Sequence, residues 1–134
     1  MTPKEFLNQA WRIEKRIDRK IEERERLNAK LTSGRSANLT GMPRGGGGDW
    51  TDSAARLIEM DKTLHDEILE LCRVKREVHE AISAIAEVKY RMVLELRYCN
   101  YMSWPRIAED MGYDLRNVYI LHGKALLRVK VPPQ

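Results

Sequence analysis

The side chains of this sequence best suited to chemistry are cations and hydrogen-bond donors near the C-terminal end. Arginine can form two parallel hydrogen bonds with guanine and asparagine with adenine, while lysine and tyrosine can bind phosphate or pack along a groove wall. This chemistry is recognition of double-stranded DNA, and it requires no catalytic group. We therefore predict DNA contacts by Arg106, Arg116, Asn117, Tyr119, Ile120, Lys124 and Arg128.

A helix-turn-helix over residues 103–129 is the element that would position these side chains. Exposed charges on a helix are often only a solvated surface, so the DNA prediction depends on this element. Ser103 is a good N-cap for the start of a helix, and Pro105 fits the first turn of that helix. Gly112 stands where a helix end commonly needs a left-handed residue, and Asp114 can cap the next helix.

The spacing of small and apolar residues predicts that these two helices cross closely. Ala108 is small where the helices would touch, and Val118 and Leu121 recur at helical spacing on the inner side of the second helix. Two residues of that helix stay ambiguous. Ile120 fits a thymine methyl group or a partner chain, and His122 fits a phosphate contact or a packing position.

A third helix is expected before these two, from about residue 87 to Tyr98 or Cys99. It would close a small core beneath the helix-turn-helix. The residues expected to fill that core are Met92, Val93, Leu96, Trp104, Ile107 and Val118.

The N-terminal part of the chain predicts long amphipathic helices. Thr2, Pro3 and Glu5 form a capping box with proline at the first helical position. Apolar residues then recur three or four positions apart as far as Leu31, with an interruption at Arg24 and charged residues between them. A second long stripe, beginning at Thr51 or Asp52, runs through Leu57, Met60, Leu64, Ile68, Leu71, Val74, Val78, Ile82 and Ile85.

Between these stripes, residues 32–50 are rich in glycine, serine, asparagine and proline, and we predict a flexible linker there. The linker would join a coiled-coil hairpin, or let the helices pair with another chain as a homodimer, or both. An ordinary helical bundle is the alternative. The expected division is a helical dimerisation region at residues 1–86 and a DNA-binding domain at residues 87–131.

Charge and composition are consistent with a small intracellular protein. The chain has 134 residues and a net charge of +4, but residues 51–86 carry eight acidic and five basic side chains, which disfavours that segment as a DNA surface. The N-terminus lacks the apolar core of a signal peptide, and no run has the roughly 18 apolar residues needed to cross a bilayer. We therefore expect a cytoplasmic protein without a membrane partner.

No constellation of residues predicts an enzyme, a cofactor or a metal site. His65, Cys72 and His79 repeat every seven residues, which spans about 10 Å of helix and is too far for neighbouring side chains to share an ion. Cys72 and Cys99 are expected to be reduced thiols. The glycine run at residues 45–48 lacks the following lysine and serine or threonine of a phosphate loop.

The run from Val93 to Leu127 resembles region four of the sigma-70 family in its VLELRY segment, its IA pair followed by a glycine, and its tail with Tyr119 and His122. With the charged N-terminal half and the glycine-rich break, the chain is similar to small phage and prophage regulators of the sigma-like, ArpU or RinA type. The resemblance implies activation of phage genes, commonly the late set, through promoter DNA in a bacterial host, at the nucleoid. It leaves a contact with RNA polymerase open.

The sequence thus predicts an all-α protein, with a long coiled-coil-like helical hairpin followed by a three-helix unit like sigma-70 region four. The helix from Asp114 would enter the major groove, where Arg116 and Asn117 read bases while Lys124 and Arg128 bind phosphates. Two alternatives remain: a phage DNA-packaging subunit like a small terminase, and a sigma-like adaptor that binds proteins instead of DNA.

Overall fold

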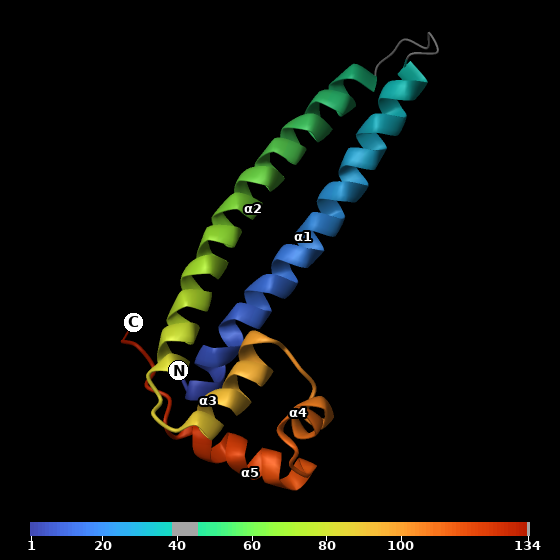
Figure 1. Ribbon diagram of the computed structural model, residues 1–134. Coiled ribbons are helices and arrows are strands. Elements are labelled where there is room, and N and C mark those ends of the chain that lie inside the picture. Colours follow the sequence, from blue (N-terminus) through green and yellow to red (C-terminus); the bar gives the residue numbers. More distant parts are fainter. Residues whose placement is uncertain (39–45, 134) are drawn as a thin grey trace. The chain divides into compact units, whose positions relative to one another are not determined.

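The protein is helical throughout the residues that the structure describes. This computed structural model describes the backbone of residues 1–38 and 46–133, with side chains at 1–33 and 50–133. Within these ranges there is no strand, so the predicted all-α class is confirmed. The elements in chain order are α1 (Pro3–Asn38), α2 (Gly46–Ser83), α3 (Val88–Leu94), the π-helical turn η1 (Glu95–Cys99), α4 (Trp104–Met111) and α5 (Leu115–Leu126) (Figure 1).

The N-terminal helix begins as its capping box predicts. The backbone N–H of Thr2 donates to Glu5 Oε2 at 3.0 Å, and the N–H of Glu5 donates to Thr2 Oγ1 at 3.2 Å. These reciprocal bonds satisfy donors that have no partner inside the helix. Among the described helices, none has a stretch long and apolar enough to span a membrane.

The long helices extend further into the predicted linker than expected. α1 continues to Asn38 and α2 begins at Gly46, so the assignment of all of residues 32–50 to a linker is wrong at both ends. Propagating an existing helix adds one hydrogen bond per residue, whereas starting a new one is unfavourable, so an established helix continues through polar residues of weak propensity. The rest of the predicted linker, residues 39–45, lies outside the described residues.

The chain divides into two compact units, one comprising residues 1–13 with 71–134 and the other residues 14–70. The predicted boundary between residues 86 and 87 falls within the first unit, and a functional division there stays a prediction.

In the unit of residues 14–70, α1 and α2 run alongside each other in opposite directions, and ion pairs fix their register (Figure 1). Lys20 Nζ lies 2.6 Å from Glu67 Oε1, and Arg24, later in α1, pairs with Asp61, earlier in α2. Burial of apolar side chains contributes little to the pairing of α1 and α2 in this unit, because few of them are buried and several large ones are exposed. Ile17 and Leu64 are buried, whereas Ile21, Trp50, Ile58, Ile68 and Leu69 are exposed.

The other unit contains most of the hydrophobic core. Its fully buried side chains come from the start of α1, the end of α2, and α3, α4 and α5. They include Phe6, Leu7, Val74, Val78, Ile82, Val93, Leu94, Ile107 and Val118. The first turns of α1 therefore complete the core beneath the C-terminal helices, although the two segments lie far apart in the sequence.

A π-helical turn shifts the register of the third helix. In η1 the N–H of Asn100 donates to the carbonyl oxygen of Glu95 at 3.0 Å, five residues earlier. The turn adds one residue to the helical period, so residues after it rotate relative to the phase of an α-helix.

This shift corrects part of the predicted core. Val93 is buried as expected, but Met92 is 43% exposed and Leu96 is only half-buried. Leu94 and Tyr98 are buried instead. The buried residues Val93 and Tyr98 are five positions apart, which is the interval of a π turn. The predicted core residues were chosen with α-helical spacing instead. Of the other predicted core residues, Ile107 and Val118 are buried and Trp104 is half-buried.

Two leucines test whether the start of α1 belongs to the core. Leu7 is 0% exposed and Leu127 is 84% exposed. We expect Leu7→Ala to lower the free energy of unfolding by about 2–5 kcal/mol, since it removes buried apolar atoms and leaves a cavity. Leu127→Ala should change it by less than about 0.5 kcal/mol. Urea unfolding followed by circular dichroism measures both values, and similar values for the two variants would contradict the core described above.

Candidate nucleic-acid interface

Helix α4 begins and ends as the sequence predicts. Ser103 is its N-cap, and the Ser103 hydroxyl accepts the backbone N–H of Arg106 at 3.4 Å. Gly112 ends the helix in the left-handed region, with φ 71° and ψ 29°. The N–H of Tyr113 donates to the carbonyl oxygen of Ala108 at 3.0 Å, which closes the helix end.

Helix α5 follows after a short turn. Asp114 is its N-cap, and Asp114 Oδ1 accepts the N–H of Asn117 at 2.8 Å. α5 contacts both α3 and α4, and α4 also contacts η1. The caps therefore set where each helix begins, and the packing sets which face of α5 is covered.

The covered face of α5 is apolar apart from one histidine. Val118 and Ala125 are fully buried, and Leu121 is half-buried. His122 is 8% exposed, so its ring is a packing residue in this structure and not a surface group.

His122 forms the polar contact of this buried face. Its Nε2 lies 2.7 Å from the hydroxyl oxygen of Tyr98, and its ring meets the Trp104 ring edge-on at 4.5 Å between centroids. Burial is the largest cause that lowers the pKa of His122 from 6.5 to about 4, and the nearby charges of Lys4 and Arg97 contribute the rest of this shift. The imidazole is thus neutral at physiological pH.

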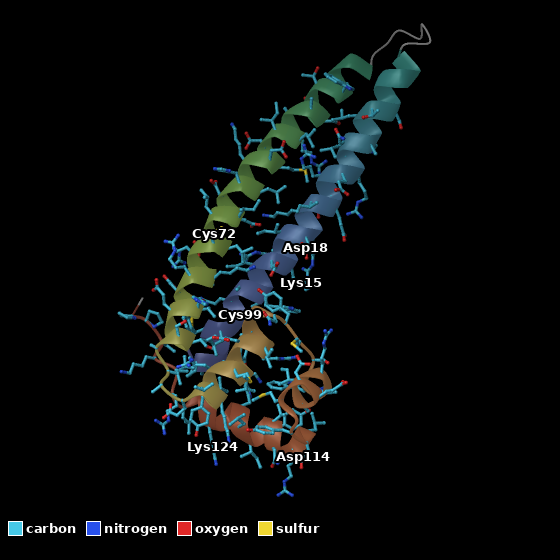
Figure 2. All side chains as sticks on the ribbon, viewed as in Figure 1. Lys15, Asp18, Cys72, Cys99, Asp114 and Lys124 are labelled. Atoms are coloured by element: carbon cyan, nitrogen blue, oxygen red, sulfur yellow. The ribbon has the colours of Figure 1, made fainter. Side chains whose placement is uncertain are left out.

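The opposite face of α5 presents the predicted DNA-contacting polar groups. Arg116, Asn117 and Lys124 are all exposed, and α5 itself contains no acidic residue. In the described part of the chain, no hydrogen bond or ion pair involves the side chains of Arg116 or Lys124. Figure 2 shows Lys124 on the outer side of α5, with Asp114 at the start of the helix.

Tyr119 and Ile120 lie on the same exposed side. The Tyr119 ring packs edge-on against Trp104, with 5.5 Å between centroids, which restrains its position. Ile120 is exposed, as either of its two predicted roles requires.

Arg106 and Arg128 lie elsewhere. Arg106 is exposed in the first turn of α4. Arg128 follows the end of α5, and its guanidinium lies 3.1 Å from Glu87 Oε1 and 5.7 Å from the Tyr90 ring centroid. The structure thus groups Arg116, Asn117, Tyr119, Ile120 and Lys124 on α5, while Arg128 is engaged by residues at the start of α3.

Sequence reasoning missed two residues of this surface. A shallow groove of about 190 Å³ lies beside α5, and Lys89 of α3 lines it together with Asn117, Ile120 and Lys124. Lys89 is distant in the sequence, so no local pattern marks it. Gly123 is exposed on α5, and a Cβ at its position would meet nothing within 4 Å. Its spacing of seven from Arg116 is the signal that could have placed it on the outer face.

No metal site accompanies these residues. Among the described residues, no group of three or more histidine, cysteine, aspartate or glutamate side chains could hold a metal ion.

A family model described as "Protein of unknown function (DUF1492)" matches residues 30–129. The chain belongs to this family. The matched range contains all of the predicted DNA-contacting residues of this DUF1492 chain, and it excludes the start of α1. No match was found among curated proteins or among solved structures.

Two glycines provide a matched test of the turn before α5. Gly112 has φ 71°, whereas Gly123 lies within α5, and a Cβ at either position would meet nothing within 4 Å. We expect Gly112→Ala to lower the free energy of unfolding by about 1–2 kcal/mol through backbone strain. Gly123→Ala should raise it by about 0.5–1 kcal/mol. Thermal or urea unfolding gives both values, and a stabilising Gly112→Ala would exclude the left-handed turn.

The neutral, buried His122 predicts a pH dependence of stability. Its pKa is about 4 in the folded chain and 6.5 in the absence of burial, so the unfolded chain takes up the proton first as the pH falls. The contribution to stability is complete above pH 6.5 and is lost progressively toward pH 4. The slope in this window is at most about 1.4 kcal/mol per pH unit.

Urea unfolding between these pH values should show a fall in the free energy of unfolding of the native chain. The part of this fall that comes from His122 should be absent in the His122→Gln variant. Should that variant fail to fold, an NMR titration of the His122 ring protons reports the pKa directly. A midpoint near 6.5 would contradict the burial of this ring.

Proposed function

We propose that this protein is a non-catalytic, sequence-specific regulator of transcription that binds double-stranded DNA. In this proposal α4 and α5 form a helix-turn-helix, and α5 enters the major groove. The observation that carries it is the division of α5 into two faces. One face is buried on α3 and α4, and the other exposes Arg116, Asn117 and Lys124 with no acidic neighbour in the helix.

The dimensions of α5 support this role. Its 12 residues give a helix about 18 Å long, and the major groove of B-DNA admits an α-helix. Recognition helices place their N-terminal residues at base edges. Arg116 and Asn117 occupy that end of α5, so they are the base-reading residues, with guanine and adenine as their favoured partners.

In this proposal the phosphate contacts come from the other cations near α5. Lys124 and Lys89 both line the groove beside α5. Gly123 lets the backbone of α5 approach the DNA more closely than any other residue would. Arg106 can add a contact from α4, whereas Arg128 must leave Glu87 before it can bind a phosphate.

Pairing of two chains through the long helices completes the proposal. The unit of residues 14–70 buries few apolar side chains and exposes Ile58, Ile68 and Leu69, which a second chain would cover. A single helix-turn-helix unit buries only about 600–1,000 Å² of protein surface on DNA, so a homodimer on two half-sites provides specificity that one unit lacks.

The biological setting follows from the sigma-like resemblance of residues 93–127. It favours a phage or prophage regulator of the ArpU or RinA type, acting at promoters in a bacterial cell. Contact with RNA polymerase is a further part of this proposal that the same resemblance suggests.

Arg116 tests the base-reading role. A preferred site is first selected from random duplexes, and binding is then measured by fluorescence anisotropy at fixed salt. Arg116→Ala should weaken binding to the preferred site by about 5–150-fold, since a bidentate contact with a base contributes about 1–3 kcal/mol of discrimination. Binding to an unrelated duplex should weaken much less.

Arg19→Ala is the charge-matched control, because Arg19 is an exposed arginine on α1, in the other unit. This variant should bind like the native chain. Equal losses on both duplexes would remove Arg116 from base reading. Absence of salt-dependent affinity in the native chain would overturn DNA binding itself.

A further inference from the structure

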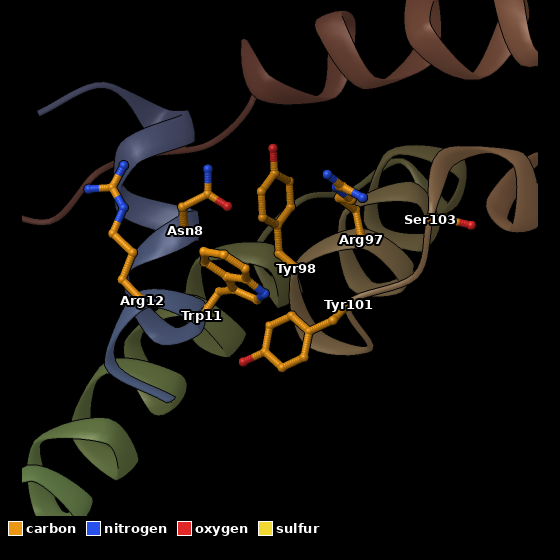
Figure 3. A pocket seen from close by; sticks show the side chains of 7 residues that line it. All are labelled: Asn8, Trp11, Arg12, Arg97, Tyr98, Tyr101 and Ser103. Atoms are coloured by element: carbon orange, nitrogen blue, oxygen red, sulfur yellow. The ribbon is translucent and has the colours of Figure 1, made fainter. Parts of the chain in front are cut away.

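A pocket of about 450 Å³ lies within the unit formed by residues 1–13 and 71–134 (Figure 3). One side comes from the first turns of α1 and the other from η1 and the segment that follows it. This volume lies in the range of small-molecule sites, which are about 300–1,000 Å³. Its lining includes Trp11, Arg12, Arg97, Tyr98 and Tyr101.

The lining combines aromatic rings with cations. Trp11, Tyr98 and Tyr101 provide ring surfaces, and Figure 3 shows Arg12 and Arg97 on opposite sides of them. No acidic side chain lines this pocket. Flat faces beside guanidinium groups suit a ligand that carries both a planar ring and a negative charge.

Arg97 is held in place beside the pocket. Its guanidinium donates to the carbonyl oxygen of Met102 at 2.9 Å and lies 4.5 Å from the centre of the Trp104 ring. A guanidinium has five N–H donors, so this bond leaves others for an anion. The positive charge of Arg97 acts on Tyr98, where it opposes the rise in the pKa of Tyr98 that burial causes, and on His122, whose pKa it helps to lower.

The backbone at this pocket is unusual in two respects. Tyr101 has φ 56°, and among the described residues it is the non-glycine residue with a positive φ. It follows the π-helical turn η1, which carries Tyr98. Both kinds of irregularity are uncommon and occur often at functional sites. The bond from Tyr98 to His122 further fixes one ring of the pocket before any ligand binds.

We propose that this pocket binds a small molecule in which a planar ring carries a phosphate or a carboxylate group. The ring stacks on the aromatic lining, and the anionic group pairs with the guanidinium of Arg12, while Arg97 adds positive charge from the other side of the rings. This proposal does not depend on DNA binding, because it concerns a different set of residues.

Isothermal titration calorimetry of the full chain tests the chemical class. AMP and salicylate combine a ring with a phosphate and with a carboxylate, respectively; adenosine lacks the charge, and inorganic phosphate lacks the ring. At least one of the first two probes should bind at least tenfold more tightly than adenosine and inorganic phosphate. The stronger of the two identifies the combination of ring and anionic group that fits the pocket better. If neither exceeds those two compounds, the proposal is overturned.

Two variants locate the binding. Arg12→Ala changes an exposed side chain and should weaken binding of the tighter probe about tenfold or more with an unchanged unfolding midpoint. Trp11→Leu, which removes an exposed stacking surface, should also weaken it. Arg19→Ala should have no effect. Equal affinities of the Arg12 and Arg19 variants would place the ligand outside this pocket.

Discussion

The packing of one face of α5 against α3 and α4 is the constraint on which the rest of this structure depends. Val118 and Ala125 supply the apolar contact, and the bond between His122 and Tyr98 supplies the polar one. A buried imidazole without a partner would be costly, so the phenol and the ring fix each other. With this face committed to the core, Arg116 and Lys124 have to face solvent. The proposed DNA-reading surface is thus a consequence of what lies beneath it.

The same packing connects the ends of the chain. Phe6 and Leu7 are fully buried in the unit that contains α5, so the C-terminal helices are supported by the first turns of α1. The pocket beside Tyr98 arises where these turns meet η1. The π-helical turn that carries Tyr98 therefore lines the candidate ligand pocket and also supports α5 from beneath, through the bond to His122.

Local sequence patterns predicted those features that depend only on interactions between neighbouring residues. The caps at Ser103 and Asp114 and the left-handed Gly112 follow from short-range hydrogen bonding and backbone sterics, and each stands as expected. The exposed side of α5 followed from its helical period. The burial of Tyr98 in place of Leu96 did not, because a π turn has no clear mark in the sequence and it changes the period within one turn. Contacts between distant segments were also out of reach, as with Lys89 beside α5 and residues 1–13 beneath it.

The most direct test of the central claim is an NMR titration of the ¹⁵N-labelled full chain with a duplex DNA fragment at low salt. We expect the largest amide shifts on residues 115–124 of α5, and we expect added salt to reverse them. Unchanged spectra, or shifts confined to residues 14–70, would contradict it.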